Sequence, residues 1–329
     1  MTSNQVSVIG AGAFGSALAL SFARAGRDVV LWGRNAALMG EMAANRQCGA
    51  ALPGVALDDR ITPTADLALA CKPTVIVAAI PTQDLGDVAR LMAPYVSSRA
   101  AVISAAKGIE RTTGFFVTEI LRDALGTHRF GVISGPSFAT DVARGLPTAI
   151  SLAMAGAEDA ESLAQALSSA TLRLYHTTDI RGVEIGGAAK NVLAIAAGIV
   201  VGMGLGESAR AAMITRGFAE LRRYAEGFGA RPETLMGLSG LGDLVLTASS
   251  AQSRNYSLGL ALGAGKAPGE ANPAGKLAEG AFTAAILAQT SRKRGIEMPI
   301  VEAVAGVLEG ALSVREAVTS LMTRPLRGE

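Results

Sequence analysis

Two lysines occupy settings in which an amine could take part in chemistry. The chain has 24 arginines but only six lysines, so a lysine inside an uncharged segment is informative. Lys107 follows an apolar run in AVISAAKGIE, and Lys190 lies within IGGAAKNVLAIAAG. Burial away from water lowers the pKa of a lysine towards neutral pH, and so does a nearby cation, whereas arginine stays protonated. We therefore predict that these lysines act on a substrate. The alternatives are a surface position for Lys107 and a structural ion pair for Lys190.

Three polar segments could complete a site with these lysines. Asp243, in LSGLGDL, could orient or neutralise a buried lysine, or it could cap a helix. QSRN at residues 252–255 offers a guanidinium, an amide and a hydroxyl, which suit a phosphate, although it could also be a polar loop. SGPSFA at residues 134–139 follows an apolar run, so its backbone N–H groups could face an anion.

Histidine and cysteine are too few for several common kinds of site. The chain has two of each: His128, His176, Cys48 and Cys71. They offer no CxxC pair, no metal site and no Ser-His-Asp arrangement. We therefore expect no metal, no disulfide framework and a structural role for all four residues.

A glycine-rich turn near the start of the chain predicts a dinucleotide site. Residues 6–15, VSVIGAGAFG, are an apolar run that leads into GxGxxG, with Gly10, Gly12 and Gly15. The first glycine allows a tight turn, the second lets the backbone approach a pyrophosphate, and the third lets helix and strand pack closely. Because a strand precedes the turn and a helix and second strand follow it, a glycine turn without ligand is the weaker alternative.

The end of the next apolar run bears on the choice of cofactor. LWGR places Arg34 where NAD-binding proteins usually have the acid that binds the ribose 2′-hydroxyl. A guanidinium can pair with a 2′-phosphate, so the sequence favours NADP over NAD. The alternative is that Arg34 is a solvated residue at the start of a helix.

Alternating strands and helices must position these residues in the first half of the chain. The strand-like runs are continuous in valine, isoleucine and alanine, as in strands that are covered on both faces. We predict strands at 6–9, 28–32, 74–80, 101–104, 130–133, 148–154 and 172–175. We predict helices at 13–25, 35–46, 83–93, 113–125 and 157–168. This alternation predicts an α/β fold with a doubly wound, Rossmann-like parallel sheet.

The second half of the chain lacks strand-like runs. Helical patterns fall at 182–203, 207–228, 232–238, 255–263, 279–294, 299–309 and 314–321, and a loop is expected at 265–275. We place a boundary near residue 180. It gives a dinucleotide-binding domain at 1–180 and an all-helical substrate domain at 181–329.

Composition limits the classes of partner. The 329 residues are 50% apolar and 18% charged, with a net charge of +2 and a mean hydropathy of +0.35. Because no basic run is present, we expect no nucleic-acid partner. The uncharged stretch 1–23 lacks the basic start of a signal peptide. The stretch 192–206 is shorter than the ~17–25 residues needed to span a bilayer. We expect a cytoplasmic protein without membrane insertion.

Taken together, these segments resemble the bacterial NAD(P)-dependent glycerol-3-phosphate dehydrogenases. The resemblance covers nearly the whole chain and follows the family's order. GPSFA and GGAAKN are specific to this family, whereas GxGxxG alone is not. The matching segments are GAGAFGSALA, VLWGR, AAKGIE, VISGPSFA, GLPTAIS, GGAAKNVLAIAAG, ITRGFAE, GLGDLVLT, QSRN and the AEG at 278–280.

The resemblance implies a reaction and a set of site residues. The reaction is reversible hydride transfer between NADPH or NADH and dihydroxyacetone phosphate, giving sn-glycerol 3-phosphate for phospholipid synthesis. The implied catalytic residues are Lys190 as the general acid and base, Lys107 and Asp243. The implied substrate-binding residues are Lys107, Gly135, Ser137, Lys190, Asp243, Ser253, Arg254 and Asn255. The implied cofactor-binding residues are Gly10, Gly12, Ala13, Phe14, Gly15, Arg34, Lys107, Ala139, Arg254, Leu277 and Glu279.

The chain departs from the family pattern at a few positions, and two other functions stay open. Ala13-Phe14 stand where Ser-Tyr is common, and Ser137 stands where Thr is common; neither change removes a charge. A related dehydrogenase acting on a β-hydroxy acid would bind a carboxylate, so inorganic phosphate should not compete with its substrate. A dinucleotide-sensing regulatory protein would need neither apolar-embedded lysine nor QSRN. The apolar helical half is compatible with a homodimer, which the family often forms.

Overall fold

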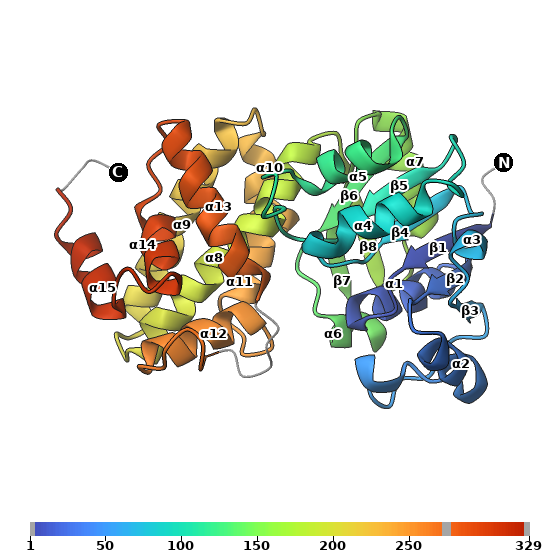
Figure 1. Cartoon of the computed structure of the whole chain (residues 1–329), viewed down its shortest axis with the longest axis horizontal. Coiled ribbons are helices and arrows are strands. Elements are labelled where there is room, and N and C mark those ends of the chain that lie inside the picture. Colours follow the sequence, from blue (N-terminus) through green and yellow to red (C-terminus); the bar gives the residue numbers. More distant parts are fainter. Residues whose placement is uncertain (1–3, 272–277, 326–329) are drawn as a thin grey trace. The chain divides into compact units, whose positions relative to one another are not determined.

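The computed structural model describes residues 4–271 and 278–325, and the chain divides into two compact units (Figure 1). Unit 1 comprises Met1–Glu110 and Phe115–Glu184, and unit 2 comprises Arg111–Gly114 and Ile185–Glu329. The division falls inside a continuous helix, after Glu184, and the boundary that we predicted lies near residue 180.

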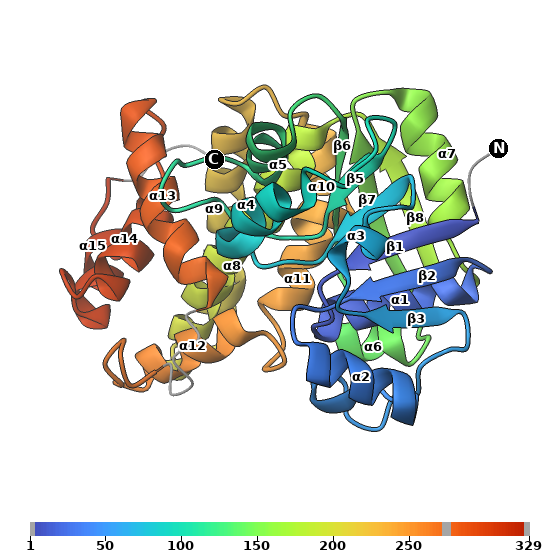
Figure 2. The same cartoon turned by 45° about the vertical axis from the view of Figure 1, so that its right-hand side comes forward.

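Unit 1 is built around an eight-stranded sheet of order β3-β2-β1-β4-β5-β6-β7-β8. Neighbouring strands are parallel except β6 and β7, which are antiparallel. Figure 2 shows β3, β2 and β1 side by side. The connections reverse direction between β1 and β4, and such a point leaves a ligand-binding crevice at the carboxyl ends of the strands. The strands are β1 (Gln5–Ile9), β2 (Asp28–Trp32), β3 (Ile61–Thr64), β4 (Val75–Ala78), β5 (Ala101–Ser104), β6 (Arg129–Ser134), β7 (Thr148–Met154) and β8 (Leu172–Thr177).

Helices cover both faces of this sheet, which explains the continuous apolar runs. In β2, Val29 and Leu31 belong to one buried cluster, whereas Val30 and Trp32 belong to another. The first cluster includes residues of α1, α2, α6 and α7, and the second includes residues of α3, α4 and α5. The expected Rossmann-like sheet is therefore confirmed. The helices are α1 (Ala13–Arg24), α2 (Ala36–Asn45), α3 (Leu67–Ala70), α4 (Thr82–Met92), α5 (Val117–Leu125), α6 (Ala139–Ala143) and α7 (Ala157–Leu167), with a 3-10 turn at Gly49–Ala51.

Both edges of the sheet are protected. The edge strand β3 contains Pro63, which has no N–H to offer to a further strand. At the β8 edge, Ser168 Oγ accepts a hydrogen bond from Leu174 N–H over 3.0 Å. Ser169 N–H donates to Leu172 O over 2.8 Å. These serines engage backbone groups that an added strand would need.

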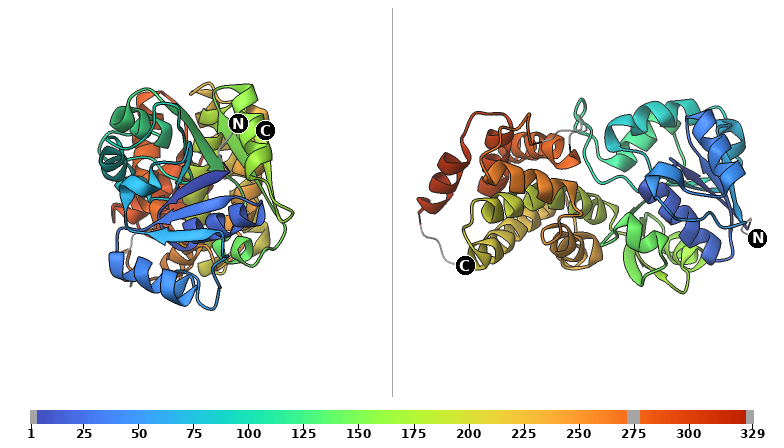
Figure 3. Two further views of the ribbon diagram at one scale, coloured as in Figure 1. Left: turned by 90° about the vertical axis from the view of Figure 1, so that its right-hand side faces the viewer. Right: turned by 90° about the horizontal axis from the view of Figure 1, so that it is seen from below.

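The described part of unit 2 contains helices only, which confirms the expected helical half (Figure 3). Its longest helix, α8 (Ile180–Gly202), begins in unit 1. The helix is long and apolar enough to cross a membrane, but 89% of its most apolar window is buried, as in a core helix. The argument that the stretch 192–206 is too short to span a bilayer was wrong, because that stretch overlaps this longer apolar helix. The other elements are α9 (Glu207–Glu226), α10 (Pro232–Met236), a π-helical turn (Leu238–Gly242), α11 (Asp243–Thr247), α12 (Arg254–Gly263), α13 (Glu279–Lys293), α14 (Pro299–Leu308) and α15 (Val314–Met322).

Candidate active site

The turn between β1 and α1 has the backbone geometry that a pyrophosphate requires. Gly10 has a φ of +118°, and a Cβ there would lie 2.5 Å from Ala79 O. A Cβ on Gly15 would lie 1.8 Å from Gly10 O. A Cβ on Gly12 would instead meet no described atom within 4 Å, so its missing side chain leaves open space beside the turn. Gly12 is the N-cap of α1 and supplies no side-chain cap, which suits an anion at the helix start.

Unit 1 brings Lys107, Gly135 and Ser137 together beyond the carboxyl ends of β5 and β6. Lys107 Nζ and Ser137 Oγ both donate to Gly135 O, each over 2.9 Å. Lys107 Nζ also lies 5.7 Å from the centre of the Phe14 ring, in the glycine turn. Gly135 has a φ of +149°, and a Cβ there would lie 2.9 Å from Ile150 Cα, so only glycine fits. Lys107 is thus half-buried and held beside the nucleotide turn.

Arg34 follows β2 and is exposed. The N-cap of α2 is its neighbour Asn35, whose Oδ1 accepts a hydrogen bond from Leu38 N–H over 3.1 Å. Arg34 is therefore not needed to start the helix. Its exposure is compatible with both interpretations, a contact to a 2′-phosphate and a solvated side chain.

Unit 2 holds Lys190 in a buried polar cluster. The residue is only 6% exposed, and Asp243 only 1%. Lys190 Nζ donates to Asp243 Oδ1 over 2.8 Å and to Thr247 Oγ1 over 2.7 Å. Thr247 Oγ1 in turn donates to Asp243 Oδ1 over 3.2 Å. The structure thus brings together the lysine and the aspartate that the sequence singled out.

Thr247 is a member of this cluster that sequence analysis missed. Asp243 and Thr247 are the first and last residues of α11, spaced i, i+4, so both lie on one side of the helix. That spacing was the available signal, although a threonine after an aspartate is too common to stand out. A buried ion pair seldom increases the stability of a protein, because removing both charges from water is costly. Such a cluster is therefore a candidate for function.

The start of α12 divides the expected phosphate-binding residues into two kinds. Arg254 is the first residue of the helix and is exposed. Ser253 caps the helix, because its Oγ accepts a first-turn backbone N–H over 3.3 Å. Asn255 is buried: its Nδ2 donates to Asn191 Oδ1 over 2.9 Å, and its Oδ1 accepts from Gly280 N–H over 3.1 Å. The hydroxyl and the amide therefore make contacts within the fold, and their contact with a substrate stays a prediction, while Arg254 offers its charge beside a helix N-terminus.

The remaining expected cofactor residues lie at helix starts. Ala13 and Ala139 are the first residues of α1 and α6, and both pack partly against the core of unit 1. Glu279 is the first residue of α13 in unit 2. Leu277 lies outside the described residues.

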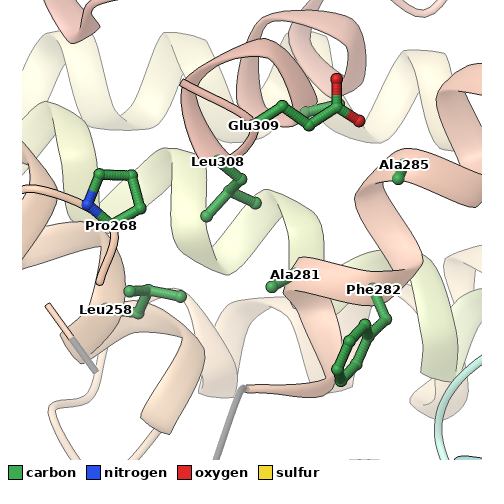
Figure 4. Close-up of a pocket in the computed structure, with 8 residues that line it drawn as sticks. Leu258, Pro268, Ala281, Phe282, Ala285, Leu308 and Glu309 are labelled. Atoms are coloured by element: carbon green, nitrogen blue, oxygen red, sulfur yellow. The ribbon is translucent and has the colours of Figure 1, made fainter. Parts of the chain in front are cut away.

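An apolar cavity in the described part of unit 2 is not lined by any expected site residue. It has a volume of about 130 Å³ and is lined by residues that include Leu258, Phe282, Leu308 and Glu309 (Figure 4). Its lining offers no cation to an anionic substrate. We therefore do not assign it to the site.

The two thiols lie in the core of unit 1 and are not candidate nucleophiles. Cys48 and Cys71 are both buried. Burial raises the pKa of both thiols, that of Cys71 to about 11, so they stay protonated at neutral pH.

Two family models match most of the chain. Residues 5–160 match the N-terminal model, and residues 179–319 the C-terminal model, of the NAD-dependent glycerol-3-phosphate dehydrogenases. The chain is 55% identical over 326 residues to glycerol-3-phosphate dehydrogenase [NAD(P)+] of Azorhizobium caulinodans, covering 99% of this chain and 98% of the relative. It is 53% identical over 326 residues to the protein of that name from Bradyrhizobium diazoefficiens, with the same shares covered.

Solved structures agree with this result. The crystal structure of glycerol-3-phosphate dehydrogenase from Coxiella burnetii aligns with a TM-score of 0.91 and 38% identity, over 97% of this chain and 99% of that chain. A ketopantoate reductase from Ralstonia eutropha aligns with a TM-score of 0.63 at 16% identity, over 95% of this chain and 99% of that chain, which shows a shared fold only.

Proposed function

Since the chain belongs to the NAD-dependent glycerol-3-phosphate dehydrogenase family and is an NAD(P)-dependent oxidoreductase, we propose that it reduces dihydroxyacetone phosphate to sn-glycerol 3-phosphate. We further propose that this product is used for glycerophospholipid synthesis. The observation that carries the proposal is the buried cluster of Lys190, Asp243 and Thr247. Such a cluster can hold an ammonium group ready to protonate a ketone oxygen.

The glycine turn fits a dinucleotide. Gly10, Gly12 and Gly15 shape the turn, and the start of α1 would hold the pyrophosphate, with Ala13, Phe14 and Ala139 beside it. Glu279 is a further proposed contact, and Arg34 would bind the 2′-phosphate of NADP. When bound, the reduced nicotinamide supplies the hydride.

Lys190 is the proposed proton donor. Its ammonium would give a proton to the ketone oxygen as negative charge develops there, a contribution of ~10²–10⁴-fold in rate. Asp243 and Thr247 accept hydrogen bonds from Nζ and so orient it. In the reverse direction the neutral amine would take the proton back.

The substrate phosphate is remote from the reacting carbon and needs a holder of its own. Exposed Arg254, at the N-terminus of α12, supports this role, because a guanidinium and the positive end of a helix dipole both favour a phosphate. Lys107, Gly135 and Ser137 are further proposed contacts. Binding energy from the phosphate would then fix the orientation of the ketone.

One assay tests the proposal. We expect oxidation of NADPH, followed by its absorbance, to require dihydroxyacetone phosphate, and inorganic phosphate to compete with that substrate. Turnover of a β-keto acid without such competition would identify a β-hydroxy acid dehydrogenase instead. Absence of turnover with every ketone, together with tight NADPH binding, would identify a dinucleotide sensor.

We also propose that the enzyme acts in the cytoplasm as a homodimer. Leu205, Met236 and Val245 of unit 2 are large apolar side chains that are 43%, 56% and 55% exposed, and a second copy could cover them. Light scattering of the purified protein measures the mass directly, and a monomer at micromolar concentration would contradict the dimer.

A further inference from the structure

Helices α8 and α12 touch backbone to backbone at a pair of glycines. A Cβ on Gly198 would lie 2.2 Å from Tyr256 O and 2.9 Å from Gly259 Cα. A Cβ on Gly259 would lie 2.1 Å from Ile195 O and 2.9 Å from Gly198 Cα. The obstacles are backbone atoms, which no rotation of a side chain can move away. Only glycine permits this approach.

A second pair, Gly202 and Gly263, repeats the contact further along both helices. A Cβ on either residue would lie 2.3 Å from a backbone oxygen of the other helix. Ahead of both pairs, Asn191 and Asn255 join the same helices by a hydrogen bond of 2.9 Å. The contacts advance in the same direction along both helices, so α8 and α12 run parallel and their relative position is fixed at several points.

Each helix carries one of the charged side chains of the proposed reaction. Lys190 directly precedes Asn191 on α8, and Arg254 directly precedes Asn255 on α12. The spacing of the two backbones therefore contributes to the spacing of the proposed proton donor and the proposed phosphate holder. Helices usually pack about 8–10 Å apart, according to the side chains at their contact. Larger residues at the glycine pairs would force these two helices apart.

We propose that Gly198, Gly202, Gly259 and Gly263 are positioning residues that set the separation between the Lys190 ammonium and the Arg254 guanidinium. That separation determines how many carbon atoms the enzyme accepts between the ketone and the phosphate of its substrate. The inference rests on the proposed function, because it needs both charged groups to contact one substrate molecule. The glycine pairs contact no substrate and act through the helices that they join.

The first test uses the unaltered enzyme with ketone phosphates that differ in length. The probes are dihydroxyacetone phosphate, with one methylene between carbonyl and phosphate ester, and its homologue with two. A fixed spacing predicts that kcat/KM falls by roughly tenfold or more for the homologue, because small displacements of reacting atoms are costly in rate. A smaller decrease would overturn the inference. Failure to reduce either ketone would overturn the proposed function instead.

The second test changes the spacing. In Gly259→Ala the added methyl group forces α12 away from α8, so kcat/KM for dihydroxyacetone phosphate should fall further than kcat/KM for the homologue. We expect the ratio of the two values to shift by roughly tenfold towards the longer ketone. The matched control is Gly40→Ala in α2, where a Cβ meets no described atom within 4 Å, and the ratio should stay unchanged.

A purely structural role for the glycines would lower the melting temperature and reduce both rates together. An unchanged ratio in folded Gly259→Ala therefore overturns the inference. If that variant shows no cooperative melting, Gly263→Ala replaces it. This site is further from Arg254, so its expected shift has the same direction and a smaller size. If neither variant folds, the length dependence of the unaltered enzyme decides.

Discussion

Lys190 shares its ammonium protons with Asp243 Oδ1 and Thr247 Oγ1 over 2.8 and 2.7 Å. This geometry serves a proton donor, and it would equally serve a structural ion pair. The two roles differ in what a neutral replacement does. A structural lysine matters for stability alone, whereas a proton donor matters for turnover even in a stable protein.

Lys190→Met keeps much of the bulk of the side chain and removes the proton. We expect turnover to fall by ~10²–10⁴-fold. Stability should also fall, by ~3–5 kcal/mol, because Asp243 is left buried without its cation. The matched control is the double variant Lys190→Met, Asp243→Asn, which carries neither charge and should recover stability but not turnover. Turnover within tenfold of the unaltered enzyme, in a folded variant, would exclude Lys190 as the donor.

Arg34 is the residue on which cofactor preference depends. In Arg34→Ala we expect the ratio of kcat/KM for NADPH to that for NADH to fall by roughly tenfold or more, because a charged hydrogen bond to the 2′-phosphate is lost. Arg122→Ala removes a charge from another exposed position in unit 1 and should leave the ratio unchanged. Equal ratios in both variants would show that Arg34 is a solvated side chain.

The sequence singles out several site residues because their types are rare or their places are recognisable. Lys107 and Lys190 stand out among six lysines, and Gly135 follows a strand end. The contacts of these residues could not be foreseen in the same way. Thr247 meets Lys190 across 57 positions of sequence, and Asn255 meets Asn191 across 64. Pairings of that range depend on how helices pack, which no local pattern records.

Among the elements, the first turns of two helices are capped by a glutamate side chain from another helix. At α5, Glu184 Oε1 accepts the N–H and hydroxyl of Thr118 over 2.9 and 2.7 Å. At α14, Glu220 accepts Ile300 N–H over 2.9 Å. The N-caps of these helices, Phe116 and Met298, cannot supply a capping oxygen from their side chains. The distant carboxylates satisfy N–H groups that would otherwise lack a partner.

Burial raises the pKa of Glu220 to about 7, although its backbone hydrogen bonds to α14 act in the opposite direction. The folded protein therefore binds this proton more tightly than the unfolded chain, whose pKa is 4.5. The resulting stability is complete below pH 4.5 and is lost as the pH rises through 7. The loss amounts to at most ~3 kcal/mol.

Glu220→Gln removes this titration. We expect the free energy of unfolding of the unaltered protein, measured in urea and taken relative to Glu220→Gln, to decrease between pH 5 and pH 8. Other titrating groups are common to both proteins and cancel in the difference. Parallel pH curves would show that Glu220 titrates alike in the folded and unfolded states.

Strands with a continuous apolar run were predicted well, whereas a strand without such a run was missed. The strand at 28–32 agrees at both ends, because its apolar residues face two buried clusters. Strand β3, with the sequence ITPT, escaped detection because it is short and contains a proline. The helix expected at 113 begins at Val117. Residues 111–114 belong to unit 2, and the capping carboxylate comes from Glu184, 66 positions away.

At the scale of the whole molecule, the order of the motifs was more informative than any single motif. A glycine turn predicts a dinucleotide, but the turn followed by GPSFA, GGAAKN and QSRN identifies one family, and the comparisons support it over nearly the full chain. The sequence did not predict that Arg111–Gly114 would belong to unit 2. Such an exchange between units depends on tertiary packing, which leaves no periodic pattern in a segment this short.

The two protected edges of the sheet have a consequence for the protein at high concentration. Pro63 removes a donor from one edge, and Ser168 and Ser169 engage backbone groups at the other, so both edges are poor templates for the strand of a neighbouring molecule. Association of copies through helical surfaces is therefore favoured over pairing at the sheet edges, and growth into β-fibrils would first require these two edges to open.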